Sequence, residues 1–301
     1  MKILICDSIA KDAIEKLKAQ GHEVDDKSGL TKEELLQIVP AYNVLVIRSA
    51  TKVTADVIAA GKNLKVVIRG GVGMDNIDAA AAKAAGIKVM NTPAASSSTV
   101  AELALGLMFM LARDLYTACA SMKEGKWDKK KFKGSELSGK VLGILGMGRI
   151  GTELAKKASA LGMMVVGYDP FVKSVEGVNV KIVSTVEELI KNADYISLHM
   201  PKTPETANLL GEARFAMMKP TAAIVNCARG GIIDEKALYN ALKEGKIRAA
   251  AFDVYSEEPP TDRQLFTLPN FIGTPHIGAS TDEAQKRIGA EIVKIMSEMA
   301  K

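Results

Sequence analysis

Short apolar runs alternate with amphipathic stretches along the first hundred residues. Four β-branched runs end in polar or Gly-rich sequence, as buried strands do. They lie at residues 2–6, 44–47, 64–68 and 87–90. Helical patterns occupy the intervals, at residues 11–20, 31–39, 54–60 and 78–85. Thr31 and Glu34 form a capping box at the second of these helices. This alternation predicts a parallel sheet with both faces covered.

A second alternating series follows an apolar helix predicted at about 98–124, which Thr99 and Glu102 can cap and Gly125 can end. Its strands are predicted at residues 141–145, 164–168, 181–183, 195–198, 223–226, 249–253 and 271–274. Its helices are predicted at residues 150–161, 186–191, 212–217, 234–244 and 280–300. The two series predict an α/β protein with a parallel sheet in each half.

Length, composition and charge narrow the functional classes. At 301 residues, the chain favours two domains over one. The net charge of +5 comes from interleaved acids and bases. Such a charge gives no strong case for a nucleic acid partner and suits a small anionic substrate. The longest apolar stretch, residues 103–112, is too short to span a bilayer, so no membrane partner is expected.

Three widely spaced cysteines match no metal-binding pattern, and no metal site is expected. Cys6, Cys119 and Cys227 are odd in number, and the N-terminus enters a strand-like run with no visible targeting segment. These features predict a reducing compartment, the cytoplasm.

A Gly-rich turn follows the predicted strand 141–145. Gly146 permits a tight turn, Gly148 lets the backbone approach a pyrophosphate, and Gly151 lets the next helix pack closely on the sheet. The helix N-terminus presents free N–H groups and a partial positive charge to phosphates. The turn therefore predicts a dinucleotide site.

Asp169 lies eighteen residues beyond Gly151, at the end of the next predicted strand. Its carboxylate can accept hydrogen bonds from a ribose diol, and its charge would repel a 2′-phosphate. No arginine follows it closely. The predicted cofactor is therefore NAD rather than NADP.

Three residues with complementary chemistry follow three late strands: Arg229, Glu258 and His276. A guanidinium meets a carboxylate bidentately, so Arg229 suits an acidic substrate. His276 suits proton transfer, and a carboxylate such as Glu258 can fix the imidazole tautomer. Because open α/β sheets bind ligands at the carboxyl ends of their strands, the three are expected to converge. Together they predict hydride-transfer chemistry on a 2-oxo or 2-hydroxy acid.

His199 and Cys227 lie in similar positions and have to be weighed against this site. His199 also follows a strand and is the rival acid, whereas His22 has the features of a surface residue. Cys227 has no partner base nearby in the sequence, so we interpret it as a small buried residue beside the cofactor rather than a nucleophile.

The first half has its own Gly-rich loop, after the predicted strand 64–68. Consecutive N–H groups in such a loop form an anion nest, and we assign Gly71, Val72 and Gly73 to the substrate carboxylate. Arg48 follows another strand and can hold a second anionic group. The alternative for Arg48 is a solvated or structural arginine.

These motifs, in this order, resemble the D-isomer-specific 2-hydroxyacid dehydrogenases over essentially the whole chain. Four segments are most similar to members that oxidise a phosphorylated substrate. They are residues 47–56, 72–78, 126–132 and 137–151. The resemblance implies NAD-linked oxidation of a phosphorylated D-2-hydroxy acid. The alternatives are a glycerate/hydroxypyruvate reductase or another D-2-hydroxyacid dehydrogenase and, from another class, an NAD-sensing corepressor.

The resemblance also implies roles for individual positions. Arg229, Glu258 and His276 match the family's catalytic residues, and Arg48 and Arg69 match positions near the substrate's anionic groups. Relatives often carry a hydroxyl residue at the position of Val72, so only a backbone contact is expected there. The implied cofactor contacts are Val72, Val100, Arg149, Ile150, Asp169, His199, Met200, Pro201, Cys227, Ala228, Arg229, Asp253, His276 and Gly278.

The fold implied by the resemblance is a pair of Rossmann-like, doubly wound domains. The first is discontinuous and flavodoxin-like, with residues 1–97 and 278–301 binding substrate, and residues 98–277 bind NAD. A cleft that closes by hinge motion and a homodimer through the nucleotide domain, embraced by the helix at 98–124, are further implications. Longer relatives append a regulatory domain, so regulation through such a module is not expected here.

Overall fold

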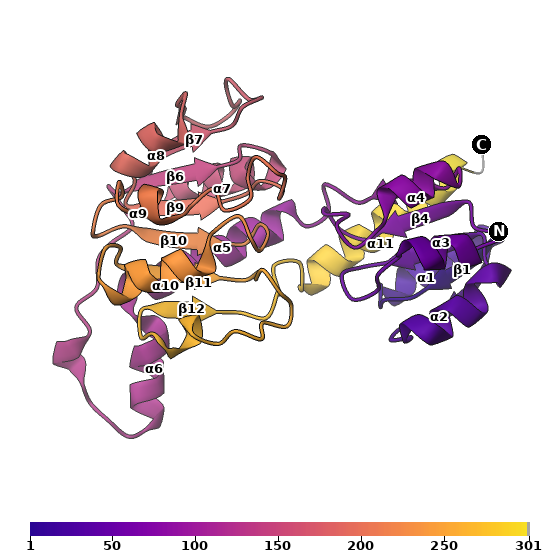
Figure 1. Cartoon of the computed structure of the whole chain (residues 1–301), viewed down its shortest axis with the longest axis horizontal. Helices are drawn as coiled ribbons and strands as arrows, with labels where there is room; N and C mark the ends of the chain where they lie inside the picture. The colour runs from indigo at the N-terminus through magenta and orange to yellow at the C-terminus, as the bar shows by residue number, and fades with distance from the viewer. Residues whose placement is uncertain (300–301) are drawn as a thin grey trace. The chain divides into compact units, whose positions relative to one another are not determined.

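The computed structural model of the protein describes residues 1–299 and divides into two compact units (Figure 1). Unit 1 comprises residues 1–96 and the C-terminal segment that begins at Ala279, and unit 2 comprises residues 97–278. Each unit is built on one parallel sheet, which confirms the predicted α/β class with two doubly wound parts.

The sheet of unit 1 has the parallel strand order β2-β1-β3-β4-β5. Its strands are β1 (Lys2–Ile5), β2 (Glu23–Asp26), β3 (Val44–Ile47), β4 (Val66–Arg69) and β5 (Lys88–Asn91). This is the flavodoxin-like order, and its direction reverses between β1 and β3. Ligands of such sheets bind where the order reverses, at the carboxyl ends of the strands.

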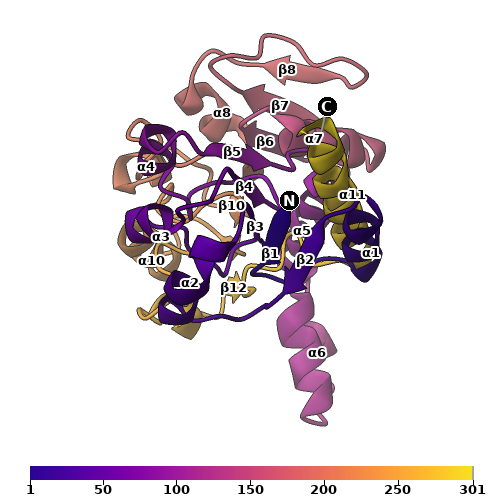
Figure 2. The same cartoon turned by 90° about the vertical axis from the view of Figure 1, so that its right-hand side faces the viewer.

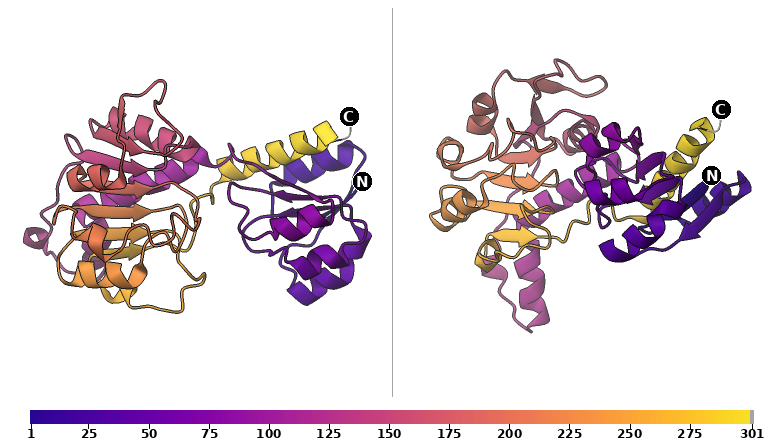
Figure 3. Two further views of the ribbon diagram at one scale, coloured as in Figure 1. Left: turned by 45° about the horizontal axis from the view of Figure 1, so that its top comes forward. Right: turned by 45° about the vertical axis from the view of Figure 1, so that its right-hand side comes forward.

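Helices cover both faces of this sheet. α1 (Lys11–Ala19) and α11 (Asp282–Met299) lie side by side on one face, where Leu17 and Ile288 enter the core (Figures 2 and 3). The other face is covered by α2 (Lys32–Ile38), η1 (Val39–Ala41), α3 (Ala55–Ala60) and α4 (Ala79–Ala84). The capping box predicted for α2 is present. The last helix was predicted to reach residue 300, which lies outside the described residues.

The sheet of unit 2 has the parallel strand order β12-β11-β10-β9-β6-β7-β8. Its strands are β6 (Val141–Leu145), β7 (Met164–Tyr168), β8 (Val180–Ile182), β9 (Tyr195–Leu198), β10 (Ala223–Asn226), β11 (Ala249–Phe252) and β12 (Phe271–Gly273). The order reverses between β6 and β9, as in dinucleotide-binding sheets, and β10, β11 and β12 are successive neighbours.

The core of unit 2 lies on both faces of its sheet. α5 (Ser97–Arg113) and α7 (Arg149–Ala160) cover one face. α8 (Val186–Asn192), α9 (Glu212–Phe215) and α10 (Glu235–Lys243) cover the other. Two short 3-10 helices, η2 (Lys129–Lys131) and η3 (Leu265–Thr267), lie in loops.

The prediction of a single long helix at about 98–124 is wrong. The chain bends by 68° between α5 and α6 (Leu115–Lys123), and Asp114 takes a left-handed conformation with φ 48°. Aspartate tolerates this region better than most residues. Thr99 lies inside the first turn of α5, so it is not the predicted cap. α6 projects from the rest of unit 2 (Figure 2).

No single helix within residues 1–299 is long and apolar enough to cross a membrane. α5 and α6 pass the test of length and composition only when they are taken together across their bend. Half of α5 is buried in the core of unit 2, where Val100, Leu107 and Met108 contact the sheet.

Candidate active site

The turn between β6 and α7 carries the three glycines of the predicted dinucleotide motif. Gly146 has φ 100°, and a Cβ there would lie 2.4 Å from the carbonyl oxygen of His199. A Cβ at Gly151 would lie 2.1 Å from the carbonyl oxygen of Gly146. A Cβ at Gly148 would meet no atom within 4 Å. Close packing therefore requires Gly146 and Gly151, while Gly148 leaves open space above the turn.

This turn lies at the switch point of the sheet. β6 and β9 are neighbours, so Gly146 meets His199 where the strand order reverses. α7 begins at Arg149, and its N-cap Gly148 has no side chain to satisfy the first N–H groups. Arg149 and Ile150 therefore open a helix whose positive end is available to an anion. The open space and the free donors fit a pyrophosphate.

Asp169 follows β7 and is fixed beside the turn by three backbone donors. Its Oδ2 accepts from the Met147 N–H at 2.9 Å, and its Oδ1 accepts from Phe171 N–H at 2.9 Å and Val172 N–H at 3.2 Å. A carboxylate oxygen has two acceptor positions, so Oδ2 keeps one for a ribose hydroxyl. These residues fit a dinucleotide whose adenosine ribose carries no phosphate.

The side chains of Glu258 and His276 form a direct pair. His276 Nδ1 lies 2.6 Å from Glu258 Oε2, and both side chains are about one-third exposed, 36% for His276 and 37% for Glu258. Glu258 Oε1 accepts from the Tyr255 N–H at 3.1 Å. His276 itself has a left-handed backbone, with φ 54°. With Nδ1 held by the carboxylate, Nε2 is the ring nitrogen left for proton transfer.

The electrostatic setting keeps Glu258 ionised. Burial raises the pKa of this carboxyl, but the hydrogen bond and charge of His276, the Tyr255 N–H and the charge of Arg229 lower it. The net pKa lies below its ordinary value. The charge of Arg229 therefore acts on Glu258, and all three predicted residues lie in unit 2.

The loop that carries Arg229 is held by Asn226, the buried last residue of β10. Asn226 Nδ2 donates to the Arg229 carbonyl at 3.0 Å, and its Oδ1 accepts from the Ala228 N–H at 3.0 Å. Arg229 Nη1 donates to the Ala228 carbonyl at 2.6 Å. Sequence reasoning missed Asn226 as a site residue. A polar residue that ends a fully apolar strand was the available signal.

Asp253, which directly follows β11, holds the segment that contains His276. The Asp253 carboxylate is buried, and Oδ1 accepts from Thr274 Oγ1 at 2.6 Å and from Ile277 N–H at 2.8 Å. Oδ2 accepts from Gly278 N–H at 2.8 Å. A Cβ at Gly278 would lie 3.1 Å from Asp253 Oδ2 and 3.4 Å from Val100 Cγ2. The predicted cofactor contacts Val100, Asp253 and Gly278 are therefore neighbours.

His199 and Cys227, the two residues weighed against this site, are both electrically neutral. His199 Nε2 is hydrogen-bonded to Ser197 Oγ at 2.8 Å, and burial lowers the pKa of His199 to about 3. A neutral imidazole is a poor proton donor, which disfavours His199 as the acid. Burial, and then the charge of Asp253, raise the pKa of the Cys227 thiol, so Cys227 lacks the thiolate of a nucleophile.

Other predicted contacts have clear positions in unit 2. Met200 and Pro201 lie just after His199 in the segment that follows β9, and the Pro201 carbonyl accepts from Thr206 Oγ1 at 2.7 Å. Across residues 1–299, no group of three His, Cys, Asp or Glu side chains could hold a metal ion.

In unit 1, Arg48 lies at the switch point between β1 and β3. Its N–H donates to Asp7 Oδ2 at 2.5 Å, and its Nη1 donates to the Ser8 carbonyl at 3.5 Å. Arg48 Nε is buried with no hydrogen-bond partner among the described residues. Burial lowers the pKa of the guanidinium and the charge of Asp7 opposes this, with a net decrease. A desolvated cation with spare donors suits an anionic ligand.

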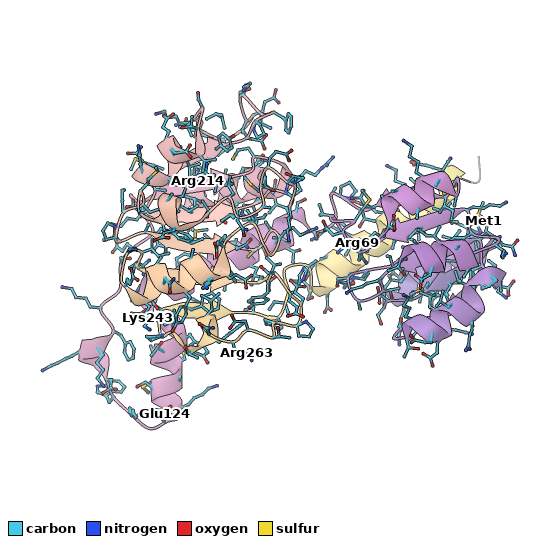
Figure 4. The ribbon with its side chains drawn as sticks, in the orientation of Figure 1. Met1, Arg69, Glu124, Arg214, Lys243 and Arg263 are labelled. Carbon is cyan, nitrogen blue, oxygen red and sulfur yellow. The ribbon has the colours of Figure 1, made fainter. Side chains whose placement is uncertain are left out.

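Arg69 ends β4 beside Ile47 and starts the Gly-rich loop (Figure 4). A Cβ at Gly71, whose φ is 148°, would lie 1.3 Å from Arg69 Nη1, so the arginine side chain crosses this glycine. The Gly71 N–H donates to the Arg69 carbonyl at 2.9 Å, so this donor of the predicted nest is already engaged. The Val72 carbonyl accepts from Asn91 Nδ2 at 2.6 Å, and Gly73 follows it in the loop.

Comparisons with known proteins identify the family of this chain. A family model described as "D-isomer specific 2-hydroxyacid dehydrogenase, NAD binding domain" matches residues 105–278. A D-3-phosphoglycerate dehydrogenase from Methanocaldococcus jannaschii is 55% identical over 296 residues, which cover 98% of this chain and 56% of that protein. A hydroxypyruvate reductase from Thermotoga maritima is 50% identical over 302 residues, which cover 99% of this chain and 98% of the reductase.

Among solved structures, an NAD-dependent formate dehydrogenase from Staphylococcus aureus in complex with NAD matches with a TM-score of 0.89. It is 30% identical, and the match covers 100% of this chain and 96% of that one. The chain spans little more than half the length of the M. jannaschii relative but nearly the whole length of the T. maritima one.

Proposed function

The chain belongs to the D-isomer specific 2-hydroxyacid dehydrogenases, and we propose that it oxidises D-3-phosphoglycerate to 3-phosphohydroxypyruvate, the first step of serine biosynthesis. The observation that carries this proposal is the 2.6 Å hydrogen bond between Glu258 and His276, next to the charge of Arg229. The 55% identical D-3-phosphoglycerate dehydrogenase supports the phosphorylated substrate.

The cofactor is NAD. When bound, NAD supplies the acceptor for the hydride of the alcohol. We propose that the first turn of α7 holds the pyrophosphate and that Asp169 binds the adenosine ribose through Oδ2. The segments 199–201, 227–229 and 276–278 follow β9, β10 and β12 and would line the same edge of the sheet.

The catalytic steps follow from the three side chains of unit 2. Arg229 would bind the substrate carboxylate through its guanidinium fork and hold C2 in place. His276 Nε2 would take the proton of the C2 hydroxyl as the hydride leaves C2, and it would return this proton in the reverse reaction. Glu258 keeps the other ring nitrogen occupied and so fixes the tautomer.

Unit 1 would supply the residues that recognise anionic groups of the substrate. Arg48 offers desolvated donors, and Arg69 lies beside it at the end of the neighbouring strand. The loop N–H groups of Val72 and Gly73 would add neutral donors for a carboxylate. A substrate with both a carboxylate and a phosphate matches two arginines better than an unphosphorylated acid does.

One assay separates the candidate substrates. NADH oxidation is measured with 3-phosphohydroxypyruvate, hydroxypyruvate and glyoxylate, for the wild type, Arg48→Gln and the control Arg263→Gln. Arg263 is an exposed arginine that lies over the ring of Phe266. Loss of a charged hydrogen bond of about 1.5–3 kcal/mol should raise the KM for the phosphorylated substrate about tenfold to hundredfold in Arg48→Gln alone. Equal use of all three acids by the wild type contradicts the proposal.

Hydroxypyruvate reductase is the second candidate. It is favoured by one observation, the T. maritima relative that is matched over 98% of its length. A wild type that prefers hydroxypyruvate, with a KM unchanged by Arg48→Gln, would establish it.

An NAD-sensing corepressor remains the candidate from another class. NADH binding without turnover of any 2-oxo acid would identify that protein.

We also propose that the protein is a homodimer in the cytoplasm. Tyr116, Met122 and Trp127 are 63%, 55% and 78% exposed on α6 and the loop after it, and apolar side chains on a projecting helix favour association. Light scattering should show a dimer that dissociates in a Tyr116→Ser/Met122→Ser double variant. A wild-type monomer would refute the dimer.

The three free cysteines support a reducing compartment, which cell fractionation can test.

A further inference from the structure

The peptide between Tyr255 and Ser256 is held by the segment that follows β10. A Cβ at Gly230 would lie 1.8 Å from the Tyr255 carbonyl oxygen and 2.4 Å from the Ser256 nitrogen, so the two backbones are in direct contact. Glu235, at the start of α10, binds Ser256 of this peptide. Its Oε1 accepts from Ser256 N–H and from Ser256 Oγ, both at 2.7 Å.

These contacts join the segment that carries Arg229 to the segment that carries Glu258. Consecutive N–H groups donate to carboxylates from different elements: Ser256 N–H to Glu235, and Tyr255 N–H to Glu258. Because the two N–H groups are consecutive in the backbone, fixing the first restricts the direction of the second. Glu258 is thereby presented with Oε1 engaged and Oε2 free for His276.

We propose that Glu235 is a positioning residue for the catalytic pair, acting through Ser256 to set the place of Glu258 relative to Arg229. This inference rests on the proposed function for its kinetic consequence. Ser256, Glu257 and Glu258 are all exposed residues of a loop, which packing alone does not hold. Two short bonds to one carboxylate oxygen supply the missing restraint.

Three variants test the restraint. Glu235→Ala removes both bonds, Ser256→Ala removes only the hydroxyl bond, and Glu235→Gln keeps an acceptor oxygen. The matched control is Glu187→Ala. Glu187 accepts two bonds, at 2.9 and 2.7 Å, from Arg214 on another part of unit 2. Each variant is assayed with the 2-oxo acid that the wild type reduces best, and NADH affinity is measured by fluorescence.

Glu235→Ala should lower kcat about tenfold, because small misplacement of catalytic groups is costly, and should leave NADH affinity within about twofold. Its acid limb of kcat/KM should move to higher pH, because the Tyr255 N–H is one of the donors that lower the pKa of Glu258. Ser256→Ala should show a smaller change of the same kind. Glu235→Gln should recover most of the rate. Glu187→Ala should change neither kcat nor the limb.

Hydrogen exchange supplies a readout that needs no turnover. Amides in the peptide covering residues 253–258 should exchange faster in Glu235→Ala than in Glu187→Ala. The inference is overturned if Glu235→Ala keeps both the kcat and the amide exchange rates of the wild type. It is also overturned if Glu187→Ala loses as much kcat as Glu235→Ala does. If the wild type reduces no 2-oxo acid, the proposed function fails, while the exchange measurement still decides whether Glu235 restrains the loop.

Discussion

Replacing Glu258 by Gln should lower kcat/KM about tenfold. In the wild type, Glu258 Oε2 lies 2.6 Å from His276 Nδ1. A hydrogen bond to a charged group contributes about 1.5–3 kcal/mol, roughly twice a neutral one. Both side chains are about one-third exposed, at 36% and 37%, so solvent screening favours the lower end of that range. A loss of about 1.4 kcal/mol corresponds to a tenfold change in rate.

The assay is the pH dependence of kcat/KM for NADH oxidation. The pKa of Glu258 lies below its ordinary value, so the wild type keeps its ionised carboxylate well into acidic solution. The contribution of this carboxylate to kcat/KM is therefore lost only as the pH falls through its lowered pKa in the folded enzyme, which gives the profile an acid limb. The pH profile of Glu258→Gln should lack this acid limb. The control is Glu257→Gln, which makes the same change of charge at a carboxylate bonded to Thr261. Identical profiles for the two variants would refute the reasoning.

Three further results are expected. Asp169→Arg should shift cofactor preference from NAD towards NADP, and an unchanged ratio of the two kcat/KM values would reject its ribose role. Gly151→Ala should cost about 1–3 kcal/mol and lower Tm, because its Cβ would lie 2.1 Å from the Gly146 carbonyl oxygen, whereas Gly148→Ala should keep the wild-type Tm and weaken NADH binding. His199→Asn should leave both limbs of the pH profile in place, since its pKa of about 3 keeps this ring neutral at working pH, and loss of the basic limb would reinstate His199 as the acid.

Much of the site could be predicted because parallel strands all end at one edge of a sheet. Arg229, Asp253 and His276 follow β10, β11 and β12, and these three strands are neighbours. Their spacing along the chain therefore translates into closeness in space. The glycine spacing carried equal information, because Gly146 and Gly151 are required by backbone contacts that any Cβ would break.

The remaining features depend on contacts that no local pattern encodes. The region 98–124 has helical character throughout, and only the left-handed Asp114 reveals the break between α5 and α6. Glu235 and Ser256 are twenty-one positions apart and meet because the start of α10 lies beside the loop that follows β11. The engaged N–H of Gly71 likewise depends on the loop conformation, so a Gly-rich loop could not show which donors stay available.

The split of unit 1 between the two ends of the chain has a consequence for biosynthesis. On one face of its sheet α11 packs beside α1, and Ile288, Ile292 and Ile295 of α11 share an apolar cluster with residues of β1 and β3. A ribosome makes α11 after every residue of unit 2, so the later-made unit 2 can complete its interior first. Until α11 is made, α1 alone covers the apolar residues of β1 and β3 on that face, and the apolar surface left exposed favours aggregation of the nascent chain.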